Sequence, residues 1–370
     1  MTSGSKEQGE RQVLDWLAGQ QAAMVALLET LVNTDSGSYD KAGIDAVGAH
    51  IRNFLRGYGV ATEVTSDVRF GDAIVARVDQ TVGPASNRPI LVMGHRDTVF
   101  PKGEPQRRPF KIEDGKAYGP GVADMKAGLV MNCFVLAAMK QFGGAPAPVT
   151  GLFTGDEEIG SPFSRKVIEQ HASGSRAVFN SEPGRPGNGV VTGRKGGMFM
   201  RFEIAGKAAH SGANFEVGIS AITELAHKTL ALNALTDIKR GITLNVGVVS
   251  GGQTVNTVAP WAKAEVDMRF VTRADRDETL AKVEAIMARS YVPGTSTKLE
   301  ITGDFLPLVE NADGKALYEH YAAGMREIGG KPEPLFTGGC ADSGFAAATG
   351  APTICAVGDR KSTRLNSSHL

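Results

Sequence analysis

The segment GLFTGDEEIG, residues 151–160, ends a short apolar run in three consecutive acids, Asp156, Glu157 and Glu158. Adjacent carboxylates repel one another. A chain therefore keeps such a cluster at the end of a buried strand only where a metal ion, an arginine or open water compensates the charge. This segment predicts a buried strand whose carboxyl end lies at a functional site.

Imidazole and carboxylate side chains follow other apolar, strand-like runs in the same way. They are His95 and Asp97 in LVMGHRDTVF, Asp124 in AYGPGVADMKAG and Glu182 in VFNSEPG. Ligands bind at the carboxyl ends of strands in open α/β sheets, so we expect these side chains to converge on one site. A histidine surrounded by acids favours a metal ion as the compensating cation.

Composition narrows the class of protein. At 370 residues, with 42% hydrophobic residues, the chain is comfortable for two domains. Lys+Arg and Asp+Glu are equal at 40 each, which leaves no overall charge to attract nucleic acid or an anionic membrane. The three cysteines lack CxxC spacing and argue against a disulfide framework or a thiolate metal site. The N-terminus resembles neither a signal peptide nor a membrane span, so we predict a cytoplasmic location.

Hydrophobic periodicity predicts an α/β domain interrupted by a second domain. The spacing predicts one amphipathic helix from about residue 10 to 31, followed by strands and helices. After TGRKGG the expected order becomes βαββαβ, which is typical of the ferredoxin-like fold. We therefore predict a first domain at 1–197 that resumes at 307–359, and an inserted domain at 198–306.

The strand-end residues fit a centre of two metal ions about 3.5–4 Å apart, which needs a bridging carboxylate and further ligands for each ion. His95 is a nitrogen ligand whose second ring nitrogen Asp97 can hold, and Asp124 is a candidate bridge. Each has an ordinary alternative. His95 and Asp97 can form a structural pair, Asp124 can cap a helix N-terminus, and Glu182 can be a turn acid.

Glu157 and Glu158 point in opposite directions on an extended chain, which predicts a division of labour between them. One carboxylate binds metal, and the other takes a proton from the attacking water. The alternative is a solvated acidic turn.

Further candidates lie in the inserted domain: His210 in GKAAHSGAN, Asn256 in GGQTVNTVAP and Arg269 in VDMRF. An arginine can capture a carboxylate with two parallel hydrogen bonds, and a neutral His with an Asn amide can donate to a developing oxyanion. For each of them, a structural role is the alternative.

The motifs GHRDTV, YGPGVADMKAG, TGDEEIGS, SEPG and GKAAHSG together resemble the zinc-dependent aminoacylase and carboxypeptidase family, and most closely its glutamate carboxypeptidase branch. The resemblance runs from about residue 25 to 359. It implies a catalytic domain with a mixed sheet between helices, and a smaller lid domain through which two subunits form a homodimer.

The resemblance also implies roles for the metal-site residues. His95, Asp124 and Glu182 hold one zinc, while Asp124 and Glu158 hold the other. Asp97 orients His95, and Glu157 is the general base that later protonates the leaving amine. Cobalt or manganese can replace zinc at nitrogen and oxygen ligands of this kind.

The same resemblance assigns the inserted domain to substrate binding. His210 reaches the site of the partner subunit to stabilise the oxyanion, with Asn256 beside it. Arg269 anchors the free carboxylate of the substrate. The turn TGGCADSG forms the wall of that pocket with Gly338, Gly339 and Asp342.

The sequence departs from the family at its end. The family supplies a last zinc-binding histidine after a strand like the one expected at 351–357, and nothing here matches it. From Arg360 the chain reads RKSTRLNSSHL, which resembles translated adapter sequence. We therefore expect residues 360–370 to be a non-native tail on a truncated catalytic domain, with His369 not a ligand.

The expected reaction is hydrolysis of an amide that joins an acyl group to a C-terminal amino acid such as glutamate. One alternative is a dipeptidase or an N-acyl-amino-acid deacylase with the same zinc site. Another is an inactive truncated enzyme or a non-catalytic dimeric relative.

Overall fold

The computed structural model describes residues 3–79, 88–143 and 147–359. The chain divides into two compact units. Unit 1 contains Met1–Gly193, Glu310–Phe336 and Phe345–Leu370, and unit 2 contains Arg194–Val309 and Thr337–Gly344. The expected non-native tail, 360–370, lies outside the described residues, as does His369.

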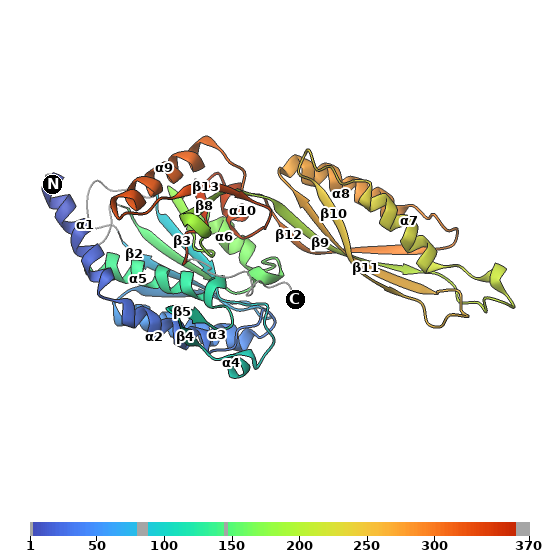
Figure 1. Cartoon of the computed structure of the whole chain (residues 1–370), viewed down its shortest axis with the longest axis horizontal. Coiled ribbons are helices and arrows are strands. Elements are labelled where there is room, and N and C mark those ends of the chain that lie inside the picture. The colour runs from blue at the N-terminus through green and yellow to red at the C-terminus, as the bar shows by residue number, and fades with distance from the viewer. Residues whose placement is uncertain (1–2, 80–87, 144–146, 360–370) are drawn as a thin grey trace. The chain divides into compact units, whose positions relative to one another are not determined.

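The sheet of unit 1 is mixed, which confirms the predicted α/β class (Figure 1). Its strands are ordered β1-β2-β6-β3-β7-β14-β8-β13. Their bounds are β1 Ala61–Thr65, β2 Ala73–Val78, β3 Ile90–His95, β6 Val149–Thr154, β7 Ala177–Asn180, β8 Gly189–Arg194, β13 Glu333–Thr337 and β14 Thr353–Cys355. Strand β3 runs parallel to both β6 and β7, so the carboxyl ends of these three central strands lie at the same end of the sheet.

Helices cover both faces of this sheet. Figure 1 shows α2, α3 and α5 on one side and α9 on the other. The helices of the unit are α1 Ser3–Ala18, α2 Gln21–Val32, α3 Lys41–Gly57, α4 Glu104–Arg107, α5 Ala127–Gln141, α6 Ser164–Ala172, α9 Ala312–Glu327 and α10 Ser343–Ala348. A short hairpin of β4 Lys111–Glu113 and β5 Lys116–Tyr118 precedes α5.

The single helix predicted at 10–31 is wrong, because the chain forms α1 and α2 with a break at Gly19. The backbone N–H of Gly19 donates to the carbonyls of Asp15 and Trp16, which closes α1 before α2 begins. Apolar residues of α2 and α3 still pack with α5 into the main core, so the periodicity located the buried face but not the break.

Helix α5 is the apolar core helix of unit 1. With the turn before it, the segment Val122–Gln141 is long and apolar enough to cross a membrane, but most of it is buried inside the protein. Phe134 and Leu136 of α5 are fully buried in the main core. Burial against the sheet therefore accounts for its hydrophobicity.

Unit 2 has the element order β-α-β-β-α-β. The elements are β9 Gly196–Ala205, α7 Ala221–Asn233, β10 Thr243–Gly251, β11 Trp261–Phe270, α8 Arg273–Ala288 and β12 Ser296–Phe305. The antiparallel strands are ordered β10-β11-β9-β12, the strand order of a ferredoxin-like sheet. Burial alternates along β11, and the buried side chains form a core with α7 and α8.

A fully buried lysine on α7 pairs with an acid of the same helix and connects α7 to α8. Lys228 Nζ lies 3.0 Å from Glu224 Oε1, one turn earlier on α7. Lys228 also donates to the carbonyls at the end of α8, those of Ile286, Met287 and Arg289. Because the last carbonyls of a helix lack partners within it, this lysine satisfies the carboxyl end of α8.

Candidate metal centre

The carboxyl ends of three neighbouring strands of unit 1 carry the centre. His95 is the last residue of β3, and Glu157 begins a short helical turn just after β6. Glu182 follows β7, which pairs with β3 on its other side. Asp124 lies in the turn that precedes α5, whose N-cap position is Lys126, so the alternative of Asp124 as an N-cap is wrong.

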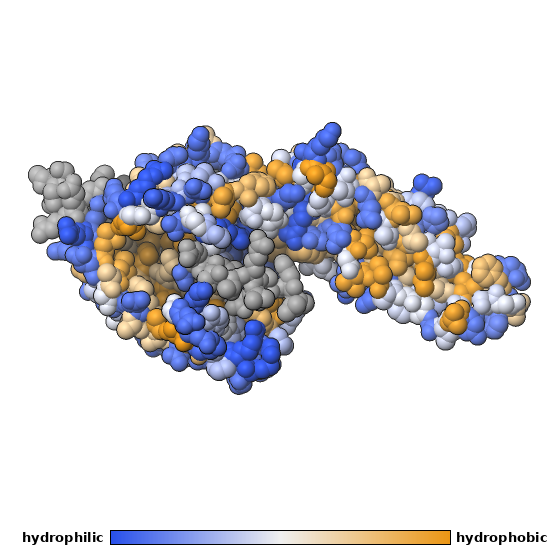
Figure 2. Space-filling view, in the orientation of Figure 1, coloured by the Kyte–Doolittle hydropathy of each residue, from blue (hydrophilic) through white to orange (hydrophobic). Residues whose placement is uncertain are grey.

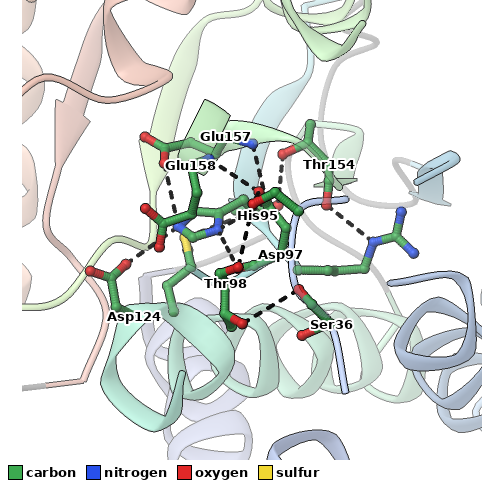
Figure 3. A network of polar contacts seen from close by, with 12 residues as sticks. Ser36, His95, Asp97, Thr98, Asp124, Thr154, Glu157 and Glu158 are labelled. Carbon is green, nitrogen blue, oxygen red and sulfur yellow. Dashed lines mark hydrogen bonds and ion pairs between the residues drawn. The ribbon is translucent and has the colours of Figure 1, made fainter. Parts of the chain in front are cut away.

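The imidazole of His95 lies at the centre of the acidic side chains (Figure 3). Its Nε2 is 3.3 Å from Asp124 Oδ1, 3.7 Å from Glu182 Oε1 and 3.9 Å from Glu157 Oε2. Ligand atoms of two overlapping groups approach within 4.8 Å of one another: His95 with Asp124 and Glu158, and His95 with Glu157 and Glu182. The geometry thus brings together every predicted metal-site residue of unit 1.

Asp97 lies behind the imidazole and ties it to the acidic turn. His95 Nδ1 is 3.0 Å from the Asp97 backbone carbonyl and 3.3 Å from its Oδ1. The Asp97 carboxylate also accepts the backbone N–H groups of Glu157 and Glu158, each at 3.1 Å, and the hydroxyl of Ser38 at 2.8 Å. Asp97 therefore fixes the positions of His95 and of the two neighbouring acids at once.

The donor set fits a divalent metal ion. A carbonyl oxygen only accepts, so the proton of a neutral His95 lies on Nδ1 and its Nε2 lone pair faces the carboxylates. Within the described residues Nε2 is buried and makes no hydrogen bond. A nitrogen of this kind among carboxylates is the combination that zinc and similar ions bind.

Charge crowding shifts the pKa values at this centre. Burial lowers the pKa of His95, but the close carboxylates of Asp124 and Asp97 and the charges of Glu157 and Glu182 outweigh it and raise the pKa well above its ordinary value. Burial, together with the charges of neighbouring acids, raises the pKa of Glu158 to about 8. The centre therefore holds protons that a metal ion would replace.

Sequence reasoning missed Arg96, a fully buried residue between His95 and Asp97. Its guanidinium donates to the backbone carbonyls of Ile44, Asp72 and Thr154. It thereby joins the start of α3, the start of β2 and the end of β6 behind the metal-site residues. The sequence could have indicated this residue, because it lies inside the GHRDTV motif and an arginine is one of the cations that can compensate the buried acids.

The predicted residues of unit 2 form two groups. His210 and Thr257 form an isolated β-bridge, and the Asn256 carbonyl accepts the backbone N–H of Ser211. His210 Nδ1 accepts the N–H groups of Gly212 and Ala213, which fixes the imidazole on an exposed loop. The structure thus places Asn256 beside His210.

The second group surrounds Arg269 on β11. Arg269 Nη1 donates to Cys340 Sγ at 3.0 Å, in the turn that carries Gly338, Gly339 and the buried Asp342. Arg194 donates to the Gly339 carbonyl at 2.7 Å. The structure thus brings Arg269 against the predicted turn, and adds Cys340 and Arg194, which sequence reasoning did not single out.

Comparison with known proteins identifies the family. The model of peptidase family M20/M25/M40 matches residues 91–369. Carboxypeptidase G2 of Pseudomonas sp. (strain RS-16) is 30% identical over 344 residues, which cover 92% of this chain and 82% of that protein. Succinyl-diaminopimelate desuccinylase of Alkalilimnicola ehrlichii is 29% identical over 284 residues, covering 70% of this chain and 73% of that protein.

Solved structures agree on the fold. An M20 family metallo-carboxypeptidase from Sulfolobus solfataricus superposes with a TM-score of 0.75 at 17% identity, covering 90% of this chain and 91% of that one. Matches of this extent in both sequence and fold show that the chain, a hydrolase, belongs to peptidase family M20/M25/M40.

Proposed function

We propose that this protein is a metal-dependent carboxypeptidase that hydrolyses an amide bond and releases a C-terminal amino acid, with glutamate as the favoured product. The observation that carries the proposal is the buried Nε2 of His95, which makes no hydrogen bond among the described residues and faces Asp124, Glu157 and Glu182. Such an arrangement costs free energy unless a cation occupies it.

In this proposal His95, Asp124 and Glu182 hold one zinc ion, and Asp124 and Glu158 hold a second. Zinc bound there supplies Lewis acidity to the scissile carbonyl. Glu157 takes a proton from the attacking water and delivers it to the leaving amine. Asp97 supports these separate roles of Glu157 and Glu158, because its carboxylate accepts the backbone N–H groups of both residues and holds the acidic turn in place.

Unit 2 contributes the groups that recognise the substrate. Arg269 anchors its free carboxylate, because a guanidinium offers parallel donors to a carboxylate. The turn with Gly338, Gly339 and Asp342 lines the same pocket. His210, with Asn256 beside it, reaches the site of the partner subunit and donates there to the oxyanion that develops on the scissile carbonyl.

Similarity to a carboxypeptidase over most of both chains favours the release of a C-terminal residue. The similarity to a desuccinylase supports the runner-up, an N-acyl-amino-acid deacylase, or a dipeptidase, with the same metal site. An inactive truncated enzyme, or a non-catalytic dimeric relative whose site binds metal weakly or not at all, is the remaining alternative.

A single experiment separates these possibilities. The protein is loaded with zinc, its metal content is measured, and hydrolysis of N-benzoyl-glutamate, glycyl-glutamate, N-acetylornithine and N-succinyl-diaminopimelate is followed by amine release. About two zinc ions per chain with preferential glutamate release from N-benzoyl-glutamate supports the carboxypeptidase. Preference for the dipeptide or for the diamine substrates supports the runner-up, and bound zinc without any hydrolysis contradicts the proposal.

The proposal includes a homodimer formed through unit 2. Strand β10 lies at the edge of its sheet, where backbone groups are available to a second strand. Figure 2 shows hydrophobic side chains exposed among polar ones over this unit, whose exposed residues include Leu230 (70%), Val248 (53%) and Val249 (58%). Light scattering should give twice the chain mass of 38.9 kDa, and Val248→Lys should halve it. A wild-type monomer at all concentrations contradicts the dimer.

We also assign the protein to the cytoplasm. Its three cysteines, Cys133, Cys340 and Cys355, are free thiols. Thiols persist in reducing compartments, whereas secreted proteins of this size commonly form disulfides. Fractionation of cells that express the native gene tests this assignment.

A further inference from the structure

The guanidinium of Arg269 is held on one edge by a carboxylate from its own strand. Arg269 Nε lies 2.7 Å from Asp267 Oδ1, and Nη2 donates to Asp267 Oδ2 at 3.0 Å. The two residues are two positions apart on β11, so their side chains lie on the same face of the sheet. Asp267 thus occupies two of the five N–H donors, and a substrate carboxylate needs others.

The thiol of Cys340 accepts from another of the N–H donors of Arg269. Arg269 Nη1 donates to Cys340 Sγ at 3.0 Å, and the ring of Phe199 covers the guanidinium at 5.2 Å from its centre. The position of Gly197 leaves room for this arrangement, because a Cβ there would lie 3.0 Å from both Arg269 Nη1 and Cys340 Sγ. The pair is therefore closely packed.

The turn that carries Cys340 is fixed independently of Arg269. Arg194, which is itself buried, donates from Nε to the carbonyl of Gly339 at 2.7 Å. Burial raises the pKa of the Cys340 thiol, although Arg269 and Arg194 oppose the change. The sulfur that faces Arg269 at neutral pH is therefore a neutral thiol.

A neutral thiol is a weak hydrogen-bond acceptor, whereas a carboxylate makes shorter and roughly twice as strong bonds with a guanidinium. We infer that Cys340 is a positioning residue: its thiol occupies Arg269 Nη1 in the free protein and yields that donor to the carboxylate of the substrate. This inference rests on the proposed role of Arg269 as the carboxylate anchor. It explains why a weak acceptor is placed against a binding group.

The acceptor strength at position 340 should then set affinity for carboxylates. The probe is glutarate, whose binding to the zinc-loaded protein is measured by calorimetry in Cys340→Ala, Cys340→Ser and Cys340→Asp. We expect the alanine variant to bind at least as tightly as wild type, the serine variant to bind several-fold more weakly, and the aspartate variant to lose about tenfold or more. Thermal unfolding checks that each variant is folded.

Two arginine variants complete the design. Arg269→Met should weaken glutarate binding about tenfold or more, whereas Arg201→Met, on the exposed face of β9, should leave it unchanged. With N-benzoyl-glutamate as substrate, KM should be unchanged or lower in Cys340→Ala, higher in Cys340→Ser and highest in Cys340→Asp, while kcat stays nearly constant. A packing role would instead give alanine and serine equal effects and would change kcat and KM without regard to acceptor strength.

The outcomes separate this inference from the proposed function. Equal binding by the alanine, serine and aspartate variants overturns the inference, and so does glutarate binding that Arg269→Met does not weaken. Hydrolysis that persists in either case leaves the carboxypeptidase proposal standing. Conversely, glutarate affinities that follow the acceptor series without any hydrolysis support the inference and contradict the proposed reaction.

Discussion

The carboxylate of Asp97 accepts the backbone N–H of Glu158 at 3.1 Å, which joins the loop after β3 to the acidic turn after β6. The same carboxylate lies beside the ring nitrogen of His95 that faces away from the metal site. One side chain thus holds both His95 and the acids opposite it. This relationship makes Asp97 the point at which the geometry of the centre is most easily disturbed.

Asp97→Asn should lower metal affinity about 10–100-fold without unfolding the protein, because residues that hold a metal-binding histidine have effects of this size. The two carboxylate oxygens accept from Glu157 and Glu158 separately, so the amide keeps one of these bonds and turns a donor toward the other backbone N–H. Competition with a fluorescent zinc chelator measures the affinity. Wild-type affinity in this variant would show that the carboxylate of Asp97 has no part in orienting His95.

Glu157→Gln and Glu158→Gln should have different effects, although the residues are neighbours. The first should keep nearly all the metal and lose turnover, because it removes the proposed proton acceptor. The second should lose metal from one position. Both residues belong to possible metal-binding groups, so metal analysis beside steady-state kinetics decides between them. Loss of zinc in Glu157→Gln contradicts its assignment as general base, as does the loss of zinc in Glu157→Ala.

Metal affinity should rise with pH at least up to about pH 8. The pKa of Glu158 is raised to about 8 in the metal-free protein, mainly by burial, so its carboxyl holds a proton below that pH. Binding releases this proton, which strengthens affinity about tenfold per pH unit for each proton released. His95, whose pKa is also raised, acts in the same direction. Calorimetry in buffers of different ionisation enthalpy counts the protons, and affinity that is constant from pH 6 to 8 refutes this linkage.

Lys228→Met should destabilise the protein by about 3–5 kcal/mol, because it leaves Glu224 buried without its cation and the end of α8 without its donor. Lys282→Met is the matched control, since Lys282 pairs with Glu278 on the exposed surface of α8. Denaturant unfolding should show little change for the control. If the free energy of unfolding falls equally in both variants, the buried pair has no special role.

Much of the architecture follows from the sequence because strand ends are marked by composition. Apolar runs before His95, Glu157 and Glu182 predicted buried strands, and the parallel pairing of β3 with β6 and β7 places their ends together. The change to βαββαβ order after TGRKGG predicted an inserted domain at 198–306, and unit 2 starts at Arg194 but also includes Thr337–Gly344, from the segment expected in the first domain. Hydrophobic periodicity and the positions of the acids were sufficient to predict these features, because both are local properties of the chain.

Other features depend on contacts between distant segments and left no periodic signal. The turn with Cys340 belongs to unit 2, although it follows helix α9 of unit 1. Its thiol meets Arg269 across 71 residues of sequence. Arg96 is similar, because its partners Ile44 and Thr154 lie far from it along the chain. The break between α1 and α2 was missed because a glycine inside an amphipathic pattern is compatible with a continuous helix.

The buried guanidinium of Arg96 has a consequence for the order in which this protein is assembled. Burial lowers its pKa to about 10, so it remains a cation at neutral pH, and the charges of Asp45, Asp97, Asp72 and Asp156 act on it. Part of the negative charge at the strand ends is therefore balanced by a cation that belongs to the chain. Small zinc domains, by contrast, cannot fold until the ion arrives. We therefore expect the polypeptide to fold before it binds metal, and its folded scaffold to exchange one divalent ion for another without unfolding.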